Sequence, residues 1–247
     1  MKVFLSALEA SPEFYKINEN IEFYNYNLMS YYYIKNKIDI SESIRNKSKE
    51  ILIDSGAHSF QKGKKVDWVK YTKQYADFIK IFDRPNVIGY FEMDVDNIIG
   101  YDKVLELRKI LENVSDKIIP VWHKNRGIED YQKMCKDYAN KIIAITGFKN
   151  EDIKDEQYLM FLKYAKKYNC KVHCLGMTRK KILNKVPFDY VDSSSWKQKS
   201  IYGQINKRKV SKEFSKIYRW KVMLENYKLG MKMQKHYYDK WKKVCND

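Results

Sequence analysis

The polar residues that follow the largely apolar run 186–191 are the strongest chemical feature of the sequence. Asp192 comes directly after this run, and three serines and Trp196 come next. A strand that ends in this way holds a carboxylate at its carboxyl end, where barrels and open sheets of parallel strands carry their sites. The same pattern is also typical of a strand that runs into a serine-rich turn, with Asp192 as a cap. This stretch alone leaves both interpretations open.

Two other apolar runs end in the same manner. Residues 51–53 lead into Asp54, Ser55, Gly56 and His58, and residues 87–93 lead into Asp94. Glu92 and Asp94 are two apart and share one face if the strand continues through them, so either carboxylate could face a pocket.

Glycine or histidine follows three further runs: His123 after 118–122, Gly147 after 142–146, and Gly176 after 172–175. Turns also favour aspartate, serine and glycine, and a single histidine is most often structural, so none of these residues identifies a site alone. Together they predict a ring of polar groups at the strand ends.

The elements that must position this ring alternate between strand and helix. Strand patterns cover 2–5, 28–34, 51–54, 87–94, 118–122, 142–146, 171–175 and 190–193, and helical patterns cover 66–82, 101–113, 128–139, 155–168 and 179–183. Several strands are almost wholly apolar, as in parallel sheets covered on both faces. Eight strands in this order predict a small (β/α)8 TIM barrel whose first two connections are irregular, with a doubly wound open sheet as the alternative. In the barrel, Asp54, Asp94 and Asp192 share one rim and face a common pocket.

Length and composition favour one barrel domain, 1–203, with a helical extension, 204–247. The 247 residues include only 9 Gly and 4 Pro, which leaves no obvious linker. The longest apolar runs are too short to span a bilayer, and Glu9 comes too early for a signal peptide. We therefore expect a cytoplasmic protein that does not associate with membranes.

The net charge of +17 favours a polyanionic partner, nucleic acid before anionic membrane, although a lysine-rich composition can also reflect an AT-rich genome. Residues 201–247 carry thirteen basic and four acidic residues, a net charge of +9. The extension interleaves these lysines and arginines with tyrosine and tryptophan. It is therefore the expected phosphate-binding surface, with Lys207, Arg208, Lys209 and Arg219 as candidate nucleic-acid contacts. The alternative is a solvated amphipathic helix packed on the barrel.

The cysteine pattern does not favour a disulfide framework or a strong metal site. Cys170, His173 and Cys174 form a loose cluster. However, 172–175 is expected to be a strand, in which His173 and Cys174 point to opposite faces.

The motifs together resemble the tRNA-guanine transglycosylase superfamily, and most closely its DpdA-type branch, which inserts 7-deazaguanines into DNA. The resemblance spans about 51–203 and is carried by Asp54-Ser55-Gly56, an acidic residue after Glu92-Met93, the glycine ending Ile145-Thr146-Gly147, and Val191 to Trp196. It implies a TIM barrel that exchanges a guanine base and needs no redox cofactor.

By this resemblance Asp192 is the nucleophile and Asp54 the second catalytic aspartate. Base-binding positions are Asp94, with Glu92 as the competing carboxylate, together with Gly147, Gly176, His58 and Trp196. Asp189 competes with Asp192 for the nucleophile, because Phe188-Asp189 also looks like the family's aromatic-aspartate pair. The serines and tryptophan after Asp192 favour the later residue.

The departures from the family concern the nucleic acid. The tRNA enzymes carry a C-x-C-x-x-C zinc motif that this sequence lacks, so we expect no metal, and DNA is favoured over tRNA as the substrate. A tRNA-directed or other nucleotide-processing barrel enzyme and a non-catalytic nucleic-acid-binding protein remain as alternatives.

Overall fold

The strands form a nearly closed parallel barrel, as predicted. The computed structural model describes residues 1–60, 66–146, 153–206 and 208–245. Its main sheet has the order β5-β4-β3-β2-β1-β9-β8-β7-β6. Its strands are β1 (Lys2–Ser6), β2 (Tyr24–Ser30), β3 (Ser48–Asp54), β4 (Val87–Phe91), β5 (Ile118–Ile119), β6 (Val121–Trp122), β7 (Ile142–Thr146), β8 (Lys171–Leu175) and β9 (Tyr190–Ser193).

Pro120 separates β5 from β6, and the segment around it connects the two edges of the sheet. β5 pairs with β4, and β6 pairs with β7. Proline has no N–H to give to a ladder, but the Pro120 carbonyl still accepts a hydrogen bond from the Ala144 N–H (2.9 Å). Residues 118–122 therefore fill one strand position between β4 and β7, which gives the eight positions of a (β/α)8 barrel and excludes the open sheet.

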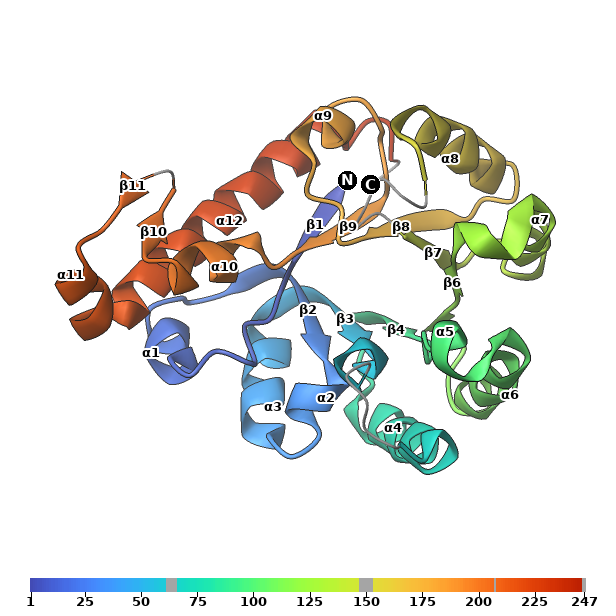
Figure 1. The fold of residues 1–247 in the computed structure, drawn as a ribbon, viewed down its shortest axis with the longest axis horizontal. Coiled ribbons are helices and arrows are strands. Elements are labelled where there is room, and N and C mark those ends of the chain that lie inside the picture. The colour runs from blue at the N-terminus through green and yellow to red at the C-terminus, as the bar shows by residue number, and fades with distance from the viewer. Residues whose placement is uncertain (61–65, 147–152, 207, 246–247) are drawn as a thin grey trace.

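Helices surround the strands on the outside (Figure 1). The α-helices are α1 (Phe14–Glu19), α2 (Tyr31–Ile34), α3 (Ile38–Lys47), α4 (Trp68–Phe82), α5 (Asp96–Ile99), α6 (Tyr101–Glu112), α7 (Gly127–Asp137), α8 (Tyr158–Lys166), α9 (Lys180–Leu183), α10 (Ser195–Ile201), α11 (Lys212–Ile217) and α12 (Arg219–Trp241). Three 3-10 turns add η1 (Ala57–Phe60), η2 (Lys124–Arg126) and η3 (Asp155–Gln157), and a small hairpin pairs β10 (Gln204–Ile205) with β11 (Arg208–Lys209).

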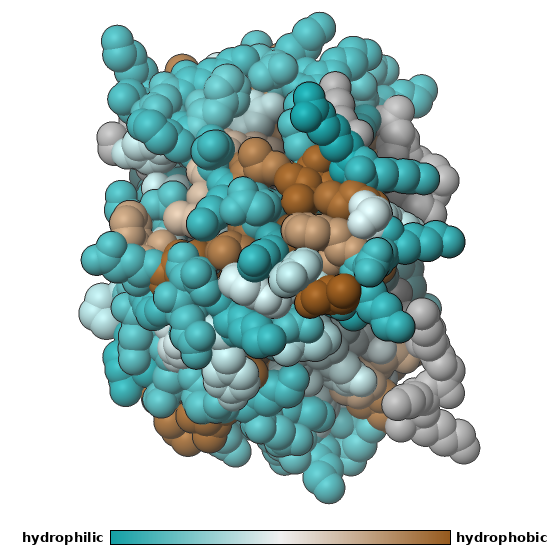
Figure 2. Space-filling model, turned by 90° about the vertical axis from the view of Figure 1, so that its left-hand side faces the viewer, coloured by the Kyte–Doolittle hydropathy of each residue, from teal (hydrophilic) through white to brown (hydrophobic). Residues whose placement is uncertain are grey.

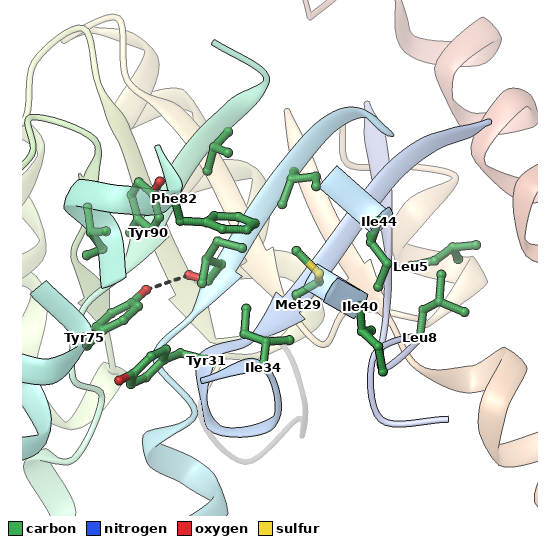
Figure 3. Close-up of a cluster of buried hydrophobic side chains, with 14 of the residues drawn as sticks. Leu5, Leu8, Met29, Tyr31, Ile34, Ile40, Ile44, Tyr75, Phe82 and Tyr90 are labelled. Carbon is green, nitrogen blue, oxygen red and sulfur yellow. Dashed lines mark hydrogen bonds between the residues drawn. The ribbon is translucent and has the colours of Figure 1, made fainter. Parts of the chain in front are cut away.

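Side chains alternate between the two faces of each strand, which gives one hydrophobic core inside the barrel and another between the strands and the helices. Inward-facing side chains fill the barrel, and they include Phe4, Tyr26, Leu28, Leu52, Phe91, Val121, Ala144 and Tyr190. Outward-facing side chains pack against the helices, and Figure 3 shows Met29 and Leu5 meeting Ile40 and Ile44 in this layer. In the same view the Tyr75 hydroxyl donates a hydrogen bond to the Ile53 carbonyl (3.1 Å), which ties α4 to β3.

The predicted strand 28–34 is displaced in the structure. β2 ends at Ser30, and Tyr31 to Ile34 form the helical turn α2. These residues are strong strand formers, but the Tyr31 ring packs against Tyr71, Tyr75 and Phe78 of α4, at centroid distances of 4.9–5.3 Å. Tertiary packing therefore overrides their local preference.

The helix α12 belongs to the outer layer of the barrel. Val222, Met223, Leu224 and Tyr227 are buried on it. The Gln234 side-chain amide donates to the carbonyls of Val3 (2.8 Å) and Tyr26 (2.7 Å), between β1 and β2. The two termini meet at this side, where the Met1 amino group lies 3.3 Å from the Cys245 Sγ (Figure 1).

Within the described ranges, no helix combines the length and the apolar character needed to cross a membrane.

Candidate active site

Asp192 lies near the carboxyl end of β9 and is held by two donors. Its Oδ1 lies 3.1 Å from the His173 Nε2 and accepts a hydrogen bond from the Gly176 N–H (2.7 Å). Gly176 has a φ of +62°, a conformation that favours glycine, and this turn directs its N–H at the carboxylate. Both contacts reach Oδ1, and in the described part of the chain no hydrogen bond reaches Oδ2. One oxygen anchors the carboxylate, and the other remains available for chemistry.

His173 is fully buried inside the barrel beneath this carboxylate. Its ring packs edge-on against Phe91, with the centroids 5.0 Å apart, and it lies near Phe4 and Tyr190. Its neighbour Cys174 belongs to the outer core, so the two side chains do face opposite ways, as expected for a strand. His173 therefore contacts Asp192, while the Cys174 thiol points to the other face of the sheet.

Asp54 lies at the carboxyl end of β3, and the pKa of its carboxyl group is raised. Burial raises the pKa of its carboxyl to about 6, although the Gly56 N–H, which donates to Oδ2 (3.0 Å), opposes the shift. The charges of Asp94 and Asp192 raise the pKa further. All three carboxylates lie at or after the carboxyl ends of parallel strands, and therefore at one rim. Gly56 has a φ of +75°, and a Cβ there would lie 2.4 Å from the Tyr32 Cβ, so the Asp-Ser-Gly turn needs its glycine.

Asp94 follows β4 and forms a second carboxylate-histidine pair. Its Oδ1 lies 2.6 Å from the His123 Nε2. Burial alone would lower the pKa of His123, but the hydrogen bond and charge of Asp94 raise it. His123 contacts only Oδ1 of Asp94, whose side chain is 29% exposed at the rim.

Among the residues that the structure describes, Asp94, Asp96 and His123 form a group that could hold a metal ion. Their ligand atoms lie within 4.8 Å of one another. However, Arg126 donates to Asp96 through Nε (3.0 Å), and its guanidinium lies over the Tyr101 ring at 4.1 Å. Asp96 and Asp94 thus each have a partner within the protein.

Glu92, the alternative to Asp94, does not face the rim. The β4 strand ends at Phe91, and Glu92 is fully buried in a two-pronged ion pair with Arg108 of α6 (2.5 and 3.1 Å). The Val121 N–H also donates to it (2.6 Å). Because the strand does not continue to Asp94, the two carboxylates do not share a face, and Asp94 is the one left at the rim.

Asp189, the alternative to Asp192, lies at the opposite end of the barrel. It is 4% exposed, pairs with Lys166 (2.7 Å) and accepts from the Val172 N–H (2.7 Å) at the start of β8. Asp189 is therefore remote from the carboxyl-end rim and ties the amino ends of β8 and β9 together.

Trp196 is 3% exposed, so its ring is not a platform for a base. It packs edge-on against Tyr227, with the centroids 5.0 Å apart, and its Nε1 donates to the Ser6 carbonyl (2.9 Å). The tryptophan thus anchors the start of α10 to the end of β1. By contrast, His58 is exposed on η1 near Asp54, while Gly147 lies outside the described residues.

The predicted nucleic-acid contacts lie beyond α10. Arg208 and Lys209 form the exposed strand β11, and Arg219 begins α12. Lys207 lies outside the described residues.

The sequence did not predict the role of two buried groups at this rim. One is His173, which contacts Asp192, and the other is Glu9. Glu9 is 1% exposed and accepts from the Ser30 N–H (3.0 Å), while its Oε2 has no hydrogen-bond partner among the residues that the structure describes. Burial raises its pKa to about 7. Strand alternation could have placed His173 inward, but no sequence pattern marked Glu9.

Comparisons with protein-family models, with curated proteins and with solved structures find no match for this chain. The arrangement of Asp54, Asp94 and Asp192 around one rim is therefore the basis on which its function has to be argued.

Proposed function

We propose that the protein is a DNA guanine transglycosylase that exchanges guanine in DNA for a 7-deazaguanine through a covalent aspartyl-glycosyl intermediate. One observation carries the proposal: Asp192, anchored through a single oxygen, shares a rim with Asp54, whose pKa is raised to about 6. A nucleophilic carboxylate beside a carboxyl that can hold a proton is the pair that glycosyl exchange with retained configuration needs.

In the first displacement, Asp192 Oδ2 attacks C1′ of the target nucleotide as the bond from C1′ to N9 of guanine breaks. The departing guanine takes a proton from Asp54, and the sugar is left as an ester on Asp192. The hydrogen bonds from His173 and Gly176 to Oδ1 fix the direction of Oδ2. They are made before the reaction, so orienting the nucleophile requires little rearrangement.

In the second displacement, Asp54 removes the N9 proton of the incoming 7-deazaguanine, which attacks C1′ and releases Asp192. The proton donated in the first step is thus recovered in the second, and no metal or redox cofactor enters the balance. The pKa near 6 suits this exchange, since a group that both gives and takes a proton works best near the ambient pH.

Guanine selectivity is assigned to Asp94. Its bond to His123 occupies Oδ1, which leaves Oδ2 to accept from N1–H and the 2-amino group of guanine. Adenine does not present that pair of donors. Since a base inside a duplex cannot reach a barrel rim, the target guanine must be flipped out or single-stranded, at a cost of a few kcal/mol.

The test is mass spectrometry of nucleosides from DNA incubated with the protein and candidate 7-deazaguanines, with tRNA in a parallel reaction. We expect a 7-deazaguanine nucleoside in DNA and none with Asp192→Asn. Incorporation into tRNA alone would replace DNA as the substrate. Binding of DNA without incorporation into either nucleic acid would make the protein a non-catalytic binder.

A further inference from the structure

A basic hollow lies at the end of α10, away from the carboxylates. Its volume is about 540 Å³, and its lining includes Gly203, Lys209, Lys212, Ser215, Lys216 and Arg219. Four of these six residues are cationic. They come from β11, α11 and the start of α12, so the fold brings together charges that are spread over eleven positions of the sequence.

Within the described residues, none of Lys209, Lys212, Lys216 and Arg219 forms an ion pair, whereas Lys228, Lys235 and Lys242 of the same extension do. A concave surface lined by unpaired cations concentrates positive potential and attracts anions. The hollow is therefore a place in this extension that favours a phosphate group.

Exposed apolar and aromatic side chains stand beside these charges. Ile201, Tyr202, Phe214, Ile217 and Tyr218 are 38–74% exposed, and the rings of Phe214 and Tyr218 lie 5.0 Å apart. Figure 2 looks onto this end of the molecule and shows hydrophobic surface surrounded by hydrophilic side chains. Flat rings next to cations are the means by which proteins hold a single nucleic-acid strand, since bases stack on the rings and phosphates meet the charges.

The walls of the hollow are fixed by a buried asparagine. The Asn226 side chain, 2% exposed, donates to the Ser200 Oγ (3.1 Å) at the end of α10 and to the Gln204 carbonyl (2.6 Å) of the hairpin. In addition, the Val210 N–H donates to the Gly203 carbonyl (2.9 Å). These bonds tie α10, the hairpin and α12 together, so the hollow exists before any ligand arrives.

The hollow is connected to the candidate active site by α10. This helix starts three residues after Asp192 and has seven residues, so it is about 10 Å long at about 1.5 Å per residue. A strand whose target base reaches Asp192 therefore has to extend by only a few nucleotides to reach the hollow.

We propose that this hollow binds the phosphate backbone of a single nucleic-acid strand within a few nucleotides of the base that is exchanged. The inference rests on the proposed function for the position of that base. The concave shape and the connection to Asp192 favour a strand over a flat anionic membrane, although lysines beside exposed isoleucines suit both.

The experiment measures binding of a fluorescent single-stranded 12-mer with one central guanine, by anisotropy at several salt concentrations. The test variant is Lys212→Ala with Arg219→Ala, and the matched control is Lys228→Ala with Lys232→Ala, which removes the same charge from α12 outside the hollow. All four residues are exposed, and unchanged melting temperatures will confirm that both variants fold.

We expect the test variant to lower the slope of log K against log salt by about 1.4, since each lost phosphate contact removes about 0.7 for a single strand. The control should keep the slope of the wild type. In addition, an uncharged methylphosphonate is placed in turn at each position within a few nucleotides of the guanine. At the position that meets the hollow, it should weaken binding of the wild type but not of the test variant.

The proposal is overturned if the test variant binds the 12-mer like the control, or if the methylphosphonate weakens both proteins equally. Binding of phosphatidylserine vesicles that depends on Lys212 and Arg219, without the same dependence for the oligonucleotide, would assign the hollow to a membrane. Base exchange is measured separately, so an absence of exchange with intact, hollow-dependent binding would contradict only the proposed function.

Discussion

Asp189 and Asp192 are three residues apart but have different hydrogen-bond partners and lie at opposite ends of β9. Asp192 is anchored by His173 and Gly176 at the rim, whereas Asp189 is buried against Lys166 and the Val172 N–H at the other end of β9. A carboxylate whose oxygens are both engaged and buried cannot attack a sugar. In the proposed reaction Asp192 is therefore the nucleophile, and we expect Asp189 to contribute to stability.

We predict that Asp192→Asn abolishes both base exchange and the covalent protein–DNA adduct on a denaturing gel, because an amide is a far poorer nucleophile. The matched variant Asp189→Asn should retain the adduct but lower the free energy of unfolding by about 2 kcal/mol, since it weakens charge-assisted hydrogen bonds. An adduct in Asp192→Asn and none in a folded Asp189→Asn would reverse the assignment.

The raised pKa of Asp54 gives the proposed reaction a pH dependence. Adduct formation needs protonated Asp54, so its rate constant should fall about tenfold per pH unit above about 6. Single-turnover adduct formation between pH 5 and pH 8 measures this. A rate that stays level from pH 6 to pH 8 would show that another group supplies the proton.

The group formed by Asp94, Asp96 and His123 allows a test for metal. Because Asp96 is paired with Arg126 and Asp94 with His123, we predict that exchange activity and melting temperature survive treatment with EDTA. One equivalent of metal in the purified protein, together with loss of activity on its removal, would identify this group as a metal site.

At the scale of elements, the helix α12 has a structural role that the sequence did not predict. Its charge and its aromatic residues suggested a surface for nucleic acid, and its exposed start does line the basic hollow. The same helix buries Val222, Met223 and Tyr227 against the barrel, and Gln234 bridges β1 and β2. Removal of the whole extension would therefore expose the barrel core, and point substitutions are the sharper test of its binding role.

We predict that Gln234→Leu lowers the free energy of unfolding by about 1–3 kcal/mol, because the carbonyls of Val3 and Tyr26 lose a buried donor. Chemical denaturation measures this difference. Gln74→Leu, an exposed glutamine on α4, is the control and should change stability by less than about 0.5 kcal/mol. Equal effects of the two substitutions would mean that the bridge does not stabilise the barrel.

At the scale of the whole molecule, ionisation of two carboxyl groups at the rim lowers the free energy of unfolding. Glu9 is buried and Asp54 is half-buried, and the pKa values of the two carboxyl groups are raised to about 7 and about 6. Removal from water is the main cause for both, and the charge of Asp54 raises the pKa of Glu9 further. Each group binds its proton more tightly in the folded state than in the unfolded state. Its contribution to stability is thus fully present below about pH 4 and is lost as the pH rises through 6 and 7.

We therefore predict that Glu9→Gln gains stability relative to the wild type between pH 5 and pH 8, since the variant has no carboxylate to ionise in the core. Denaturation midpoints across this pH range measure the gain. Glu19→Gln, which changes an exposed carboxylate, should show no such trend. A gain that does not depend on pH would mean that Glu9 stays in one protonation state across the range.

The sequence by itself determined the barrel and most of its rim. Strands and helices alternate, and the carboxyl ends of parallel strands must meet at one edge, so Asp54, Asp94 and Asp192 could be placed together from their positions alone. The opposite orientation of His173 and Cys174 followed equally from the alternation of side chains along a strand.

Only the tertiary structure decided what each of these groups contacts. The strand β4 ends at Phe91, so that Glu92 pairs with Arg108 and Asp94 lies at the rim. The tertiary structure also buried Trp196 against Tyr227, placed His173 under Asp192, and converted Tyr31 to Ile34 from an expected strand into a helical turn. The physical reason is the same in each case. Local patterns fix the period and the facing of side chains, whereas burial and hydrogen-bond partners depend on residues far away in the sequence that only the closed barrel brings into contact.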